Sequence, residues 1–258
     1  MLSRRCRHLR FLLFSVIAAV LLFASPRMVL ADADDNFSKA QKLQMEKMIR
    51  QYIMDNPEVI LQSVQRHQAQ REQADKGRAK AALLTNKEQL VADPASPVGG
   101  NVKGDVTIVE FFDYRCGFCK RVHPTVKKVL GEDKGIRYVF KEFPILGPLS
   151  VTASRAALAV WNTAPDKYYA FHDTLMTDRG AVTEAKVLKV AEKLGIKPAV
   201  MKKAMADKAI DTALARNFKL AEALNINGTP AFVIGDQLVP GAIDRATLIK
   251  LIAEARGS

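Results

Sequence analysis

Hydrophobic and polar positions follow three different patterns along the chain of 258 residues. Residues 1–31 contain a nearly continuous apolar run, whereas residues 32–96 place apolar side chains at helical spacing ahead of a long polar stretch. Residues 97–258 combine short β-branched runs with a long region of helical periodicity. Strands alternating with amphipathic helices are typical of α/β domains. The pattern therefore predicts an α/β domain at 97–258, preceded by a helical extension at 32–96.

The first 31 residues have the organisation of a secretory signal peptide. Four arginines precede an apolar run at 11–23, and Val29-Leu30-Ala31 matches the small-residue pattern of a cleavage site. Cleavage after Ala33 fits almost as well. The run is shorter than the about 20 apolar residues that a membrane-spanning helix needs. We therefore expect residues 1–31 to direct export and to be removed.

The basic balance of the chain indicates a solvated surface rather than a nucleic-acid site. Removal of residues 1–31 takes away five arginines and no acidic residue, so the net charge falls from +12 to +7. The remaining lysines are scattered among acidic residues along the helical stretches, and an exported protein meets little nucleic acid. We expect no nucleic-acid partner.

The extension at 32–96 carries an apolar stripe followed by a helix that is polar all round. Ser38 can cap a first helix, and Asn56-Pro57 ends that helix and starts a second one. Beyond an apolar start, the second helix is almost wholly polar at 65–80. The stripe either packs onto the following domain or associates with the same segment of other chains. We favour association into a dimer or trimer, because exposed apolar helical faces seldom stay unpaired.

The domain at 97–258 divides into strands at both ends and helices between them. Runs at 106–112 and 136–143 predict strands, and 150–224 has helical periodicity with breaks that indicate four or five helices. The chain returns to a strand after Pro230, and Asp244 can cap a final helix. The aromatic residues expected in the core of the helical part are Trp161, Tyr168, Tyr169, Phe171 and Phe218.

Candidate chemistry lies where the first predicted strand meets a helix, at Cys116-Gly117-Phe118-Cys119. The free N–H groups and the dipole of a helix's first turn stabilise an anion, so a thiolate at Cys116 has a lowered pKa. Cys119, one turn further on, can reach the same sulfur. After export these are the only cysteines, and exported proteins usually form several structural bridges instead. The spacing therefore indicates a redox-active pair.

The same spacing is also found in half of a zinc site, with His123 as a third ligand. A tetrahedral site normally needs a second pair of ligands, and the remaining cysteine, Cys6, lies in the segment expected to be removed. A redox pair is favoured for this reason. We interpret His123 as an ordinary residue of the helix surface.

The segment from Glu110 to Pro124, together with Gly228-Thr229-Pro230, resembles thioredoxin-fold disulfide oxidoreductases. Across roughly residues 38 to 256 the chain resembles the periplasmic DsbA-like group. Within that group it is most similar to the suppressor-of-copper-sensitivity C (ScsC) proteins, which carry an N-terminal helical extension and form dimers or trimers. The resemblance implies a thioredoxin fold with an inserted all-helical domain at about 150–224.

The resemblance also implies roles for particular residues. Cys116 and Cys119 are the expected catalytic pair, and Glu110 is a buried carboxylate that exchanges protons with Cys119. Pro230 follows a cis peptide bond next to the cysteines, and the backbone of Thr229 pairs with an extended substrate. The alternatives, a surface-facing Glu110 and a trans proline, are less favoured. The sequence leaves open whether Lys141 lies near Glu110 and the cysteines.

The function implied is a periplasmic thiol:disulfide oxidoreductase that forms or isomerises disulfides in exported proteins. Gly117 and Phe118 donate no side-chain hydrogen bond to a thiolate, so with Thr229 and the extension they favour isomerase over oxidase. We expect no organic cofactor beyond the Cys116–Cys119 disulfide, and a DsbB- or DsbD-like membrane redox partner. The alternative is a periplasmic protein that binds Cu(I) through the same two sulfurs, which are soft ligands.

Overall fold

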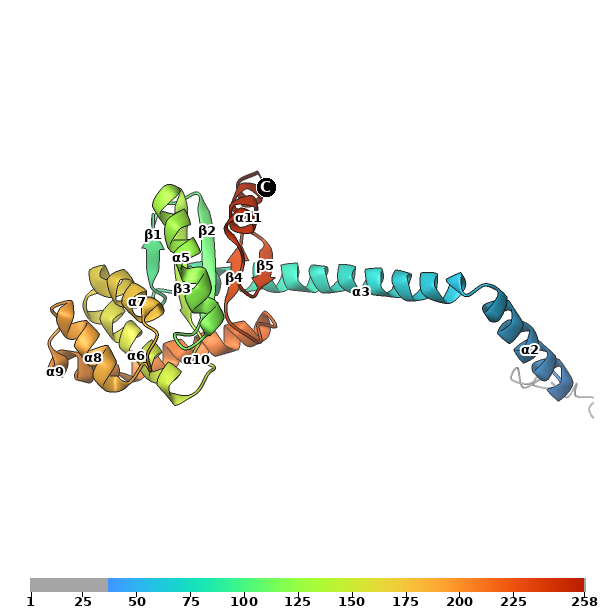
Figure 1. Ribbon diagram of the computed structural model, residues 1–258, viewed down its shortest axis with the longest axis horizontal. Helices are drawn as coiled ribbons and strands as arrows, with labels where there is room; N and C mark the ends of the chain where they lie inside the picture. Colours follow the sequence, from blue (N-terminus) through green and yellow to red (C-terminus); the bar gives the residue numbers. More distant parts are fainter. Residues whose placement is uncertain (1–36, 258) are drawn as a thin grey trace, which may run out of the picture. The chain divides into compact units, whose positions relative to one another are not determined.

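A computed structural model describes residues 37–257 (Figure 1). The contacts between residues divide the chain into two compact units, with the boundary in the sequence between His67 and Gln68. The predicted signal peptide at 1–31 lies outside the described residues and stays a prediction. Among residues 37–257, no helix combines the length and the hydropathy that crossing a bilayer requires.

Helix α2 (Lys39–Asp55) and the start of α3 (Glu58–Thr85) form the described part of the first unit. Ser38 caps α2 as expected: its hydroxyl accepts from the backbone N–H of Gln41, whose side chain accepts from the N–H of Ser38. The predicted break at Asn56-Pro57 is confirmed. Beyond it, α3 is one continuous helix through the polar stretch.

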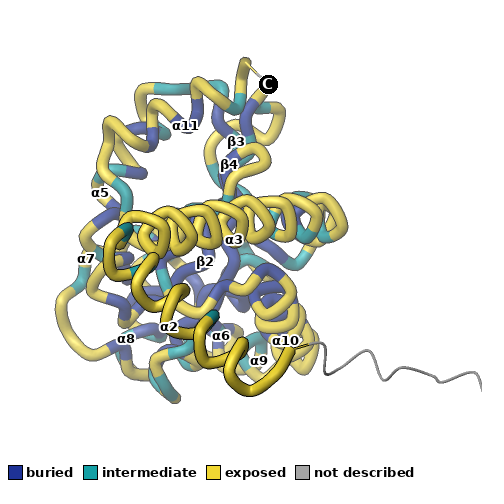
Figure 2. The backbone as a smooth tube through the Cα atoms, turned by 90° about the vertical axis from the view of Figure 1, so that its right-hand side faces the viewer, coloured by how far each residue is buried: buried dark blue, intermediate teal, exposed yellow. Residues whose placement is uncertain are grey.

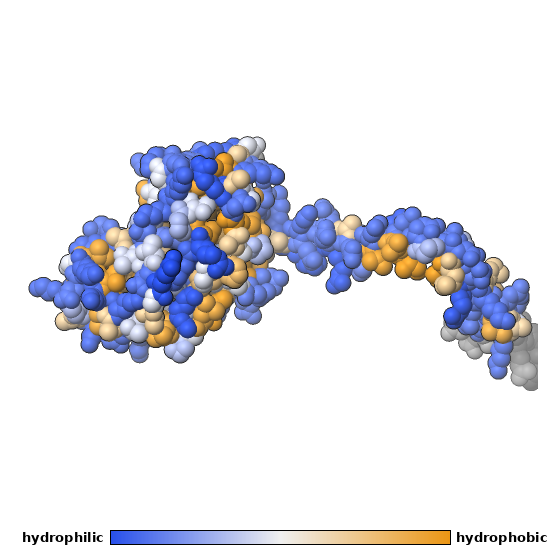
Figure 3. Space-filling view, in the orientation of Figure 1, coloured by the Kyte–Doolittle hydropathy of each residue, from blue (hydrophilic) through white to orange (hydrophobic). Residues whose placement is uncertain are grey.

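No side chain of α2 is buried, and most of the apolar residues of this unit are exposed to solvent (Figure 2). Figure 3 shows apolar side chains gathered along one side of the first turns of α3. The large exposed apolar residues of the unit are Phe37, Leu43, Met48, Ile49, Tyr52, Met54, Val59, Ile60, Leu61 and Val64. These exposed residues are what the predicted self-association would cover.

The second unit is built on a mixed sheet of five strands in the order β1-β3-β2-β4-β5. Strands β2 and β3 are parallel and the other neighbours are antiparallel. The strands are β1 (Val98–Gly100), β2 (Val106–Phe112), β3 (Ile136–Glu142), β4 (Ala231–Ile234) and β5 (Gln237–Pro240). The predicted bounds of β2 are confirmed, and β3 ends one residue earlier than expected.

Side chains alternate between two buried faces of this sheet, because successive residues of a strand point in opposite directions. Ile108 and Phe112 of β2 pack in one core with α5 (Gly117–Glu132) and α11 (Arg245–Gly257). Val109 and Phe111 pack in the other core with Leu220 of α10 (Lys208–Ala223). Burial on both faces explains why β2 is apolar almost throughout.

All the helices between β3 and β4 form a single insertion, as predicted (Figure 1). They are α6 (Pro148–Thr163), the 3₁₀ turn η1 (Pro165–Lys167), α7 (Tyr168–Thr177), α8 (Glu184–Lys193), α9 (Pro198–Met205) and α10. Tyr168 and Phe171 are buried as expected. Phe218 was expected in the core of the insertion but is 41% exposed, and its ring packs on that of Phe143.

The sequence pattern predicted that the α/β domain begins at residue 97. The second unit of the structure begins earlier, at Gln68. Leu83 of α3 and Leu90 of α4 (Lys87–Val91) are buried with Val109, Phe111 and other residues of the second core. The end of α3 is therefore part of the folded domain, and only the residues before position 68 form the separate unit.

Candidate active site

A buried aspartate shapes the turn between β2 and α5. The Oδ1 of Asp113 accepts from the backbone N–H of Arg115 at 2.7 Å and from the hydroxyl of Ser150 at 2.8 Å, and its Oδ2 accepts from the N–H of Leu146 at 3.0 Å. Its carbonyl accepts from the N–H of Cys116 at 3.0 Å. Asp113 was not among the predicted site residues, although an aspartate that follows a strand is a common turn former.

Cys116 stands at the N-cap position of α5, with its sulfur over the first turn of the helix. The N–H of Cys119 donates to the Sγ of Cys116 at 3.5 Å, and the Cys116 thiol donates to the carbonyl of Thr229 at 3.2 Å. Both thiols are free, Cys116 is 6% exposed and Cys119 is fully buried. The accessible sulfur of the pair is therefore the one at the helix N-terminus.

The two sulfurs have opposite acidities. The hydrogen bond from the Cys119 side chain is the main cause that lowers the pKa of Cys116 to about 5, assisted by the side chain of Thr229 and the backbone N–H groups of Phe118 and Cys119, and opposed by burial. Burial raises the pKa of Cys119 far above its ordinary value, and the neighbouring Cys116 and Glu110 raise it further. Near neutral pH, Cys116 is thus a thiolate and Cys119 a thiol, an arrangement in which Cys116 attacks or is attacked.

Pro230 lies beside the cysteines although it is separated from Cys116 by more than a hundred residues. The Thr229–Pro230 peptide bond is cis, as predicted, and Thr229 contacts Cys116 through the hydrogen bond to its carbonyl. Between the cysteines, Gly117 is the first residue of α5, and Phe118 is 57% exposed with the guanidinium of Arg121 at 4.2 Å from its ring centroid. Phe118 therefore presents an apolar surface next to the reactive sulfur.

Glu110 is buried on the α5 side of the sheet, as expected for an acid that interacts with the cysteines. Its Oε2 accepts from the hydroxyl of Tyr138 at 2.6 Å, while its Oε1 has no hydrogen-bond partner among the described residues. Burial raises the pKa of Glu110 to about 7, with the bond from Tyr138 opposing and the charge of Cys116 adding to the shift. A carboxyl that titrates near neutral pH can both take and give a proton.

Lys141, whose position the sequence left open, does not face these residues. Glu110 pairs with Phe140 in the register of β2 and β3, so Lys141, one residue further along, points to the opposite face. There its Nζ donates to the carbonyl of Gln89 at 2.6 Å and to the hydroxyl of Ser96 at 2.7 Å. Its role is to hold the segment between α4 and β1.

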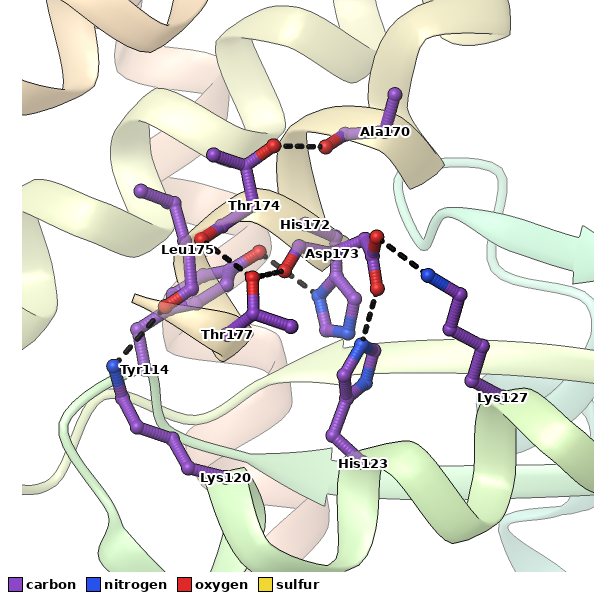
Figure 4. Close-up of polar contacts among 10 residues, drawn as sticks. All are labelled: Tyr114, Lys120, His123, Lys127, Ala170, His172, Asp173, Thr174, Leu175 and Thr177. Atoms are coloured by element: carbon purple, nitrogen blue, oxygen red, sulfur yellow. Dashed lines mark hydrogen bonds and ion pairs between the residues drawn. The ribbon is translucent and has the colours of Figure 1, made fainter. Parts of the chain in front are cut away.

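His123 is buried, and the interpretation as a surface residue is wrong. Its Nε2 lies 2.8 Å from the Oδ1 of Asp173 in α7, whose other oxygen accepts from Lys127 at 2.8 Å (Figure 4). Burial lowers the pKa of His123, so the imidazole is neutral near pH 7. These contacts fasten α5 to the helical insertion.

A second buried cluster continues from this point. The Nδ1 of His172 lies 3.1 Å from the hydroxyl of Tyr114, and this hydroxyl donates to Glu142 at 3.1 Å. Tyr168 donates to the same oxygen of Glu142 at 3.0 Å. Burial raises the pKa of Glu142 to about 8, against these hydrogen bonds. These residues lie close in space because β3 and α7 pack together. No local sequence pattern predicts that contact.

Within residues 37–257, no group of three or more histidine, cysteine, aspartate or glutamate side chains is arranged to hold a metal ion. The fold is that of thioredoxin, and the two thiols at the start of α5 place the protein among the thiol–disulfide oxidoreductases of that fold.

Comparison with known proteins gives the family. Residues 107–253 match the family described as DSBA-like thioredoxin domain, and residues 41–74 match the copper resistance protein ScsC N-terminal domain. The first match covers more than half of the chain. The chain belongs to the DSBA-like thioredoxin family and carries an ScsC-type N-terminal extension.

Individual relatives agree with this assignment. A thioredoxin-like oxidoreductase from Silicibacter pomeroyi is 40% identical and superposes with a TM-score of 0.64, over 67% of this chain and 99% of that one. A linker-deletion mutant of Proteus mirabilis ScsC is 28% identical with a TM-score of 0.66, over 87% of this chain and 99% of that one. Disulfide bond formation protein D of Bacillus subtilis is 27% identical, over 57% of this chain and 71% of its own length.

The curated relatives also include Na(+)/H(+) antiporter NhaA 1 of Salinispora arenicola, which is 26% identical over 63% of this chain. The chain spans about a quarter of the length of that protein, 26%. The similarity therefore concerns only about a quarter of the antiporter protein.

Proposed function

We propose that this protein is a periplasmic thiol:disulfide oxidoreductase that acts on exported proteins through Cys116 and Cys119. The observation that carries the proposal is a thiol whose pKa is lowered to about 5, at a helix start and in contact with Thr229 of the cis-proline loop. A low pKa favours the thiolate, which is both the attacking group and the better leaving group in disulfide exchange.

Two directions of reaction use the same atoms. In the reduced protein, the Cys116 thiolate attacks a disulfide sulfur of the client, forms a mixed disulfide and expels the second client sulfur as a thiolate. In the oxidised protein, a client thiolate attacks Cys116 and expels Cys119. Because the pKa of Cys119 is strongly raised, its departure needs a proton, and Glu110 is the group proposed to supply it. The backbone of Thr229 is proposed to hold the client in an extended conformation.

Isomerase activity is favoured over oxidase activity. Gly117 has no side chain and the side chain of Phe118 is apolar, so neither residue adds a side-chain hydrogen bond to the backbone N–H groups that stabilise the Cys116 thiolate. A less stabilised thiolate gives a less oxidising couple, since a very oxidising couple owes its potential to a strongly stabilised reduced form. A measured potential near about −120 mV would favour an oxidase instead.

Export and the redox partner are proposed from the sequence pattern, with support from the comparisons. The predicted signal peptide supports export, and a periplasmic thioredoxin-like protein from Salmonella enterica serovar Typhimurium, 32% identical over 67% of this chain, is among the structural neighbours. In that compartment the Cys116–Cys119 pair needs a partner to reset its redox state. We propose a membrane protein of the DsbB or DsbD type, and no organic cofactor.

Self-association through the extension is part of the proposal. The match to an ScsC N-terminal domain at 41–74 covers the exposed apolar residues of α2 and of the first turns of α3. Association of several chains through this region would bring several Cys116 sites into one assembly, as a dimer or trimer. An isomerase benefits because it can attack several disulfides of one misfolded client.

Deletion of residues 32–64 tests the function and the assembly together. The shortened chain is expected to sediment as a folded monomer and to reduce insulin as fast as the full exported chain. Its reactivation of scrambled ribonuclease is expected to fall about tenfold, because the benefit of several sites in one assembly is lost.

Substitution of Lys42 and Lys47, which lie in α2 but carry no apolar side chain, by glutamine serves as the control and should leave assembly and isomerisation unchanged. A full exported chain that already sediments as a monomer would contradict the assembly. Full-length protein without activity in either assay would contradict the enzymatic function.

The Cu(I)-binding alternative has one supporting observation, the match of residues 41–74 to a domain of a copper resistance protein. Two free sulfurs one helical turn apart are suitable soft ligands for Cu(I). Competition with a Cu(I) chelator separates the two functions. Tight binding by a protein that is inactive in thiol exchange would favour copper, whereas weak binding by an active protein would favour the oxidoreductase.

A further inference from the structure

A cavity of about 1140 Å³ lies next to the cis-proline loop and outside the cysteine pair. One wall is the segment 75–82 of α3, and the others are residues 223–231 and β5 with the turn before it. We call it the α3 cavity. All of its lining residues belong to the second unit, and the Nζ of Lys80 lies 2.8 Å from Asp236, which ties the α3 wall to the turn between β4 and β5. The volume exceeds that of typical small-molecule pockets, about 300–1,000 Å³, and suits a segment of polypeptide.

The α3 cavity has an apolar floor and a polar rim. Leu224, Ile226 and Ala231 line it and are almost fully buried. Along the rim, the backbone N–H groups of residues 227–229 make no hydrogen bond to any described residue. The rim also includes β5, an edge strand whose only partner in the sheet is β4. Unpaired backbone groups beside an apolar floor are the features that an extended peptide binds.

Thr229 connects the cavity to the reactive sulfur. Its carbonyl lies 3.2 Å from the Sγ of Cys116, and the same residue lines the cavity. A client chain joined to Cys116 through its own cysteine therefore passes Thr229 within a residue or two of the disulfide. Successive residues of an extended chain advance about 3.3 Å and point to alternate sides. The neighbouring residues of the client would reach the rim of the cavity, with every second side chain directed to the floor.

We propose that the α3 cavity binds the segment of a client polypeptide that flanks its reacting cysteine, with apolar side chains of that segment at alternate positions. This inference rests on the proposed function and extends it, because it makes the end of α3 a wall of the client site. The extension then has two parts: residues before 68 for assembly and residues 75–82 for client binding.

Thiol–disulfide exchange with a cysteine-containing peptide tests whether the cavity binds the flanking segment. Glutathione serves as the reference thiol, because it has no flanking segment of comparable length. The protein is first oxidised to the Cys116–Cys119 disulfide. A ten-residue peptide with one cysteine and valines at alternate positions attacks Cys116 as its thiolate. The peptide–Cys116 bond forms, the bond to Cys119 breaks, and Cys119 leaves with the electron pair and takes a proton. Rate constants for peptide and glutathione are compared as a ratio.

Ala79→Phe places a large side chain in the cavity, because Ala79 lines it and is partly buried. The ratio of the peptide rate constant to the glutathione rate constant is expected to fall about tenfold. Ala81→Phe is the matched control, since Ala81 lies on the same helix, is exposed and does not line the cavity. Asn227→Trp narrows the cavity from the opposite wall and is expected to lower the ratio as well.

Ratios for Ala79→Phe and Asn227→Trp within twofold of that for Ala81→Phe would overturn the inference. A fall in this ratio that appears only at high protein concentration would also overturn the inference. Such a dependence would show that a second copy of this chain, and not the client, occupies the cavity. Wild-type protein that reacts with neither thiol would refute the proposed function itself. If Ala79→Phe fails to fold, the ratio for Asn227→Trp alone decides.

Discussion

Replacement of Cys116 by alanine is expected to reduce thiol–disulfide exchange by at least about 1000-fold, the loss that follows removal of a nucleophile. Cys116 is the sulfur with access to solvent and with the lowered pKa, whereas Cys119 is fully buried with a raised pKa. Without Cys116, no thiolate remains that a client disulfide can reach. Insulin reduction, followed by the turbidity of the released chains, measures the loss.

Cys119→Ala is the matched variant and has a different expected outcome. Cys116 still attacks client disulfides, but the mixed disulfide cannot be resolved within the protein, so covalent complexes accumulate. They are detected as bands on a non-reducing gel that disappear on reduction, and their identification would reveal the clients. Exchange by Cys116→Ala at the wild-type rate, or complexes formed by Cys116→Ala as readily as by Cys119→Ala, would contradict the assignment.

Glu110→Gln is expected to change how stability depends on pH. Burial raises the pKa of Glu110 from 4.5 to about 7 in the folded protein, so the folded state binds the proton more tightly than the unfolded state. Below pH 4.5 the carboxyl is protonated in both states and causes no penalty. Between pH 4.5 and 7 the unfolded state releases this proton while the folded state keeps it, so the folded state loses about 3 kcal/mol, from about 1.4 kcal/mol per pKa unit, and the loss is complete above pH 7. Glutamine stays neutral and avoids this loss.

Denaturant unfolding of the reduced protein at pH 5 and pH 8 measures this effect. The gain in free energy of unfolding from Glu110→Gln should be larger by about 2.5 kcal/mol at pH 8 than at pH 5. Glu142→Gln is the control: its pKa is also raised by burial, to about 8, but it is not among the groups that shift the pKa of Cys116 or Cys119. Both variants should gain stability, and only Glu110→Gln should slow the release of Cys119. Equal exchange rates for both variants would leave Glu110 a purely structural residue.

Local sequence patterns were sufficient for the elements that surround the cysteines. The β-branched run at 106–112, the helix after Cys116 and the break at Asn56-Pro57 each depend on a few neighbouring residues, and the structure has all three. The cis bond before Pro230, which the resemblance implied, is present as well. The helical insertion was also predictable, because its amphipathic periodicity is continuous between strong breaks. The thioredoxin fold itself came from the resemblance that these elements carry together.

Contacts between distant segments were not predictable in the same way. Whether Lys141 or its neighbour faces Glu110 depends on the register of β2 with β3, and a shift of one residue reverses the answer. His123 was misplaced because its partner, Asp173, belongs to the insertion fifty residues later. The domain boundary differed for the same reason, since Leu83 and Leu90, which follow the polar stretch at 65–80, pack on residues of β2 and α10.

The most direct test is a titration of the Cys116 thiolate in the reduced protein, followed by its ultraviolet absorbance and compared with the Cys116→Ala variant. A transition centred near pH 5, absent from the variant, is expected from the pKa of Cys116. A transition centred near pH 8.5, the value of an ordinary cysteine, would contradict the account, because Cys116 would then have no special reactivity.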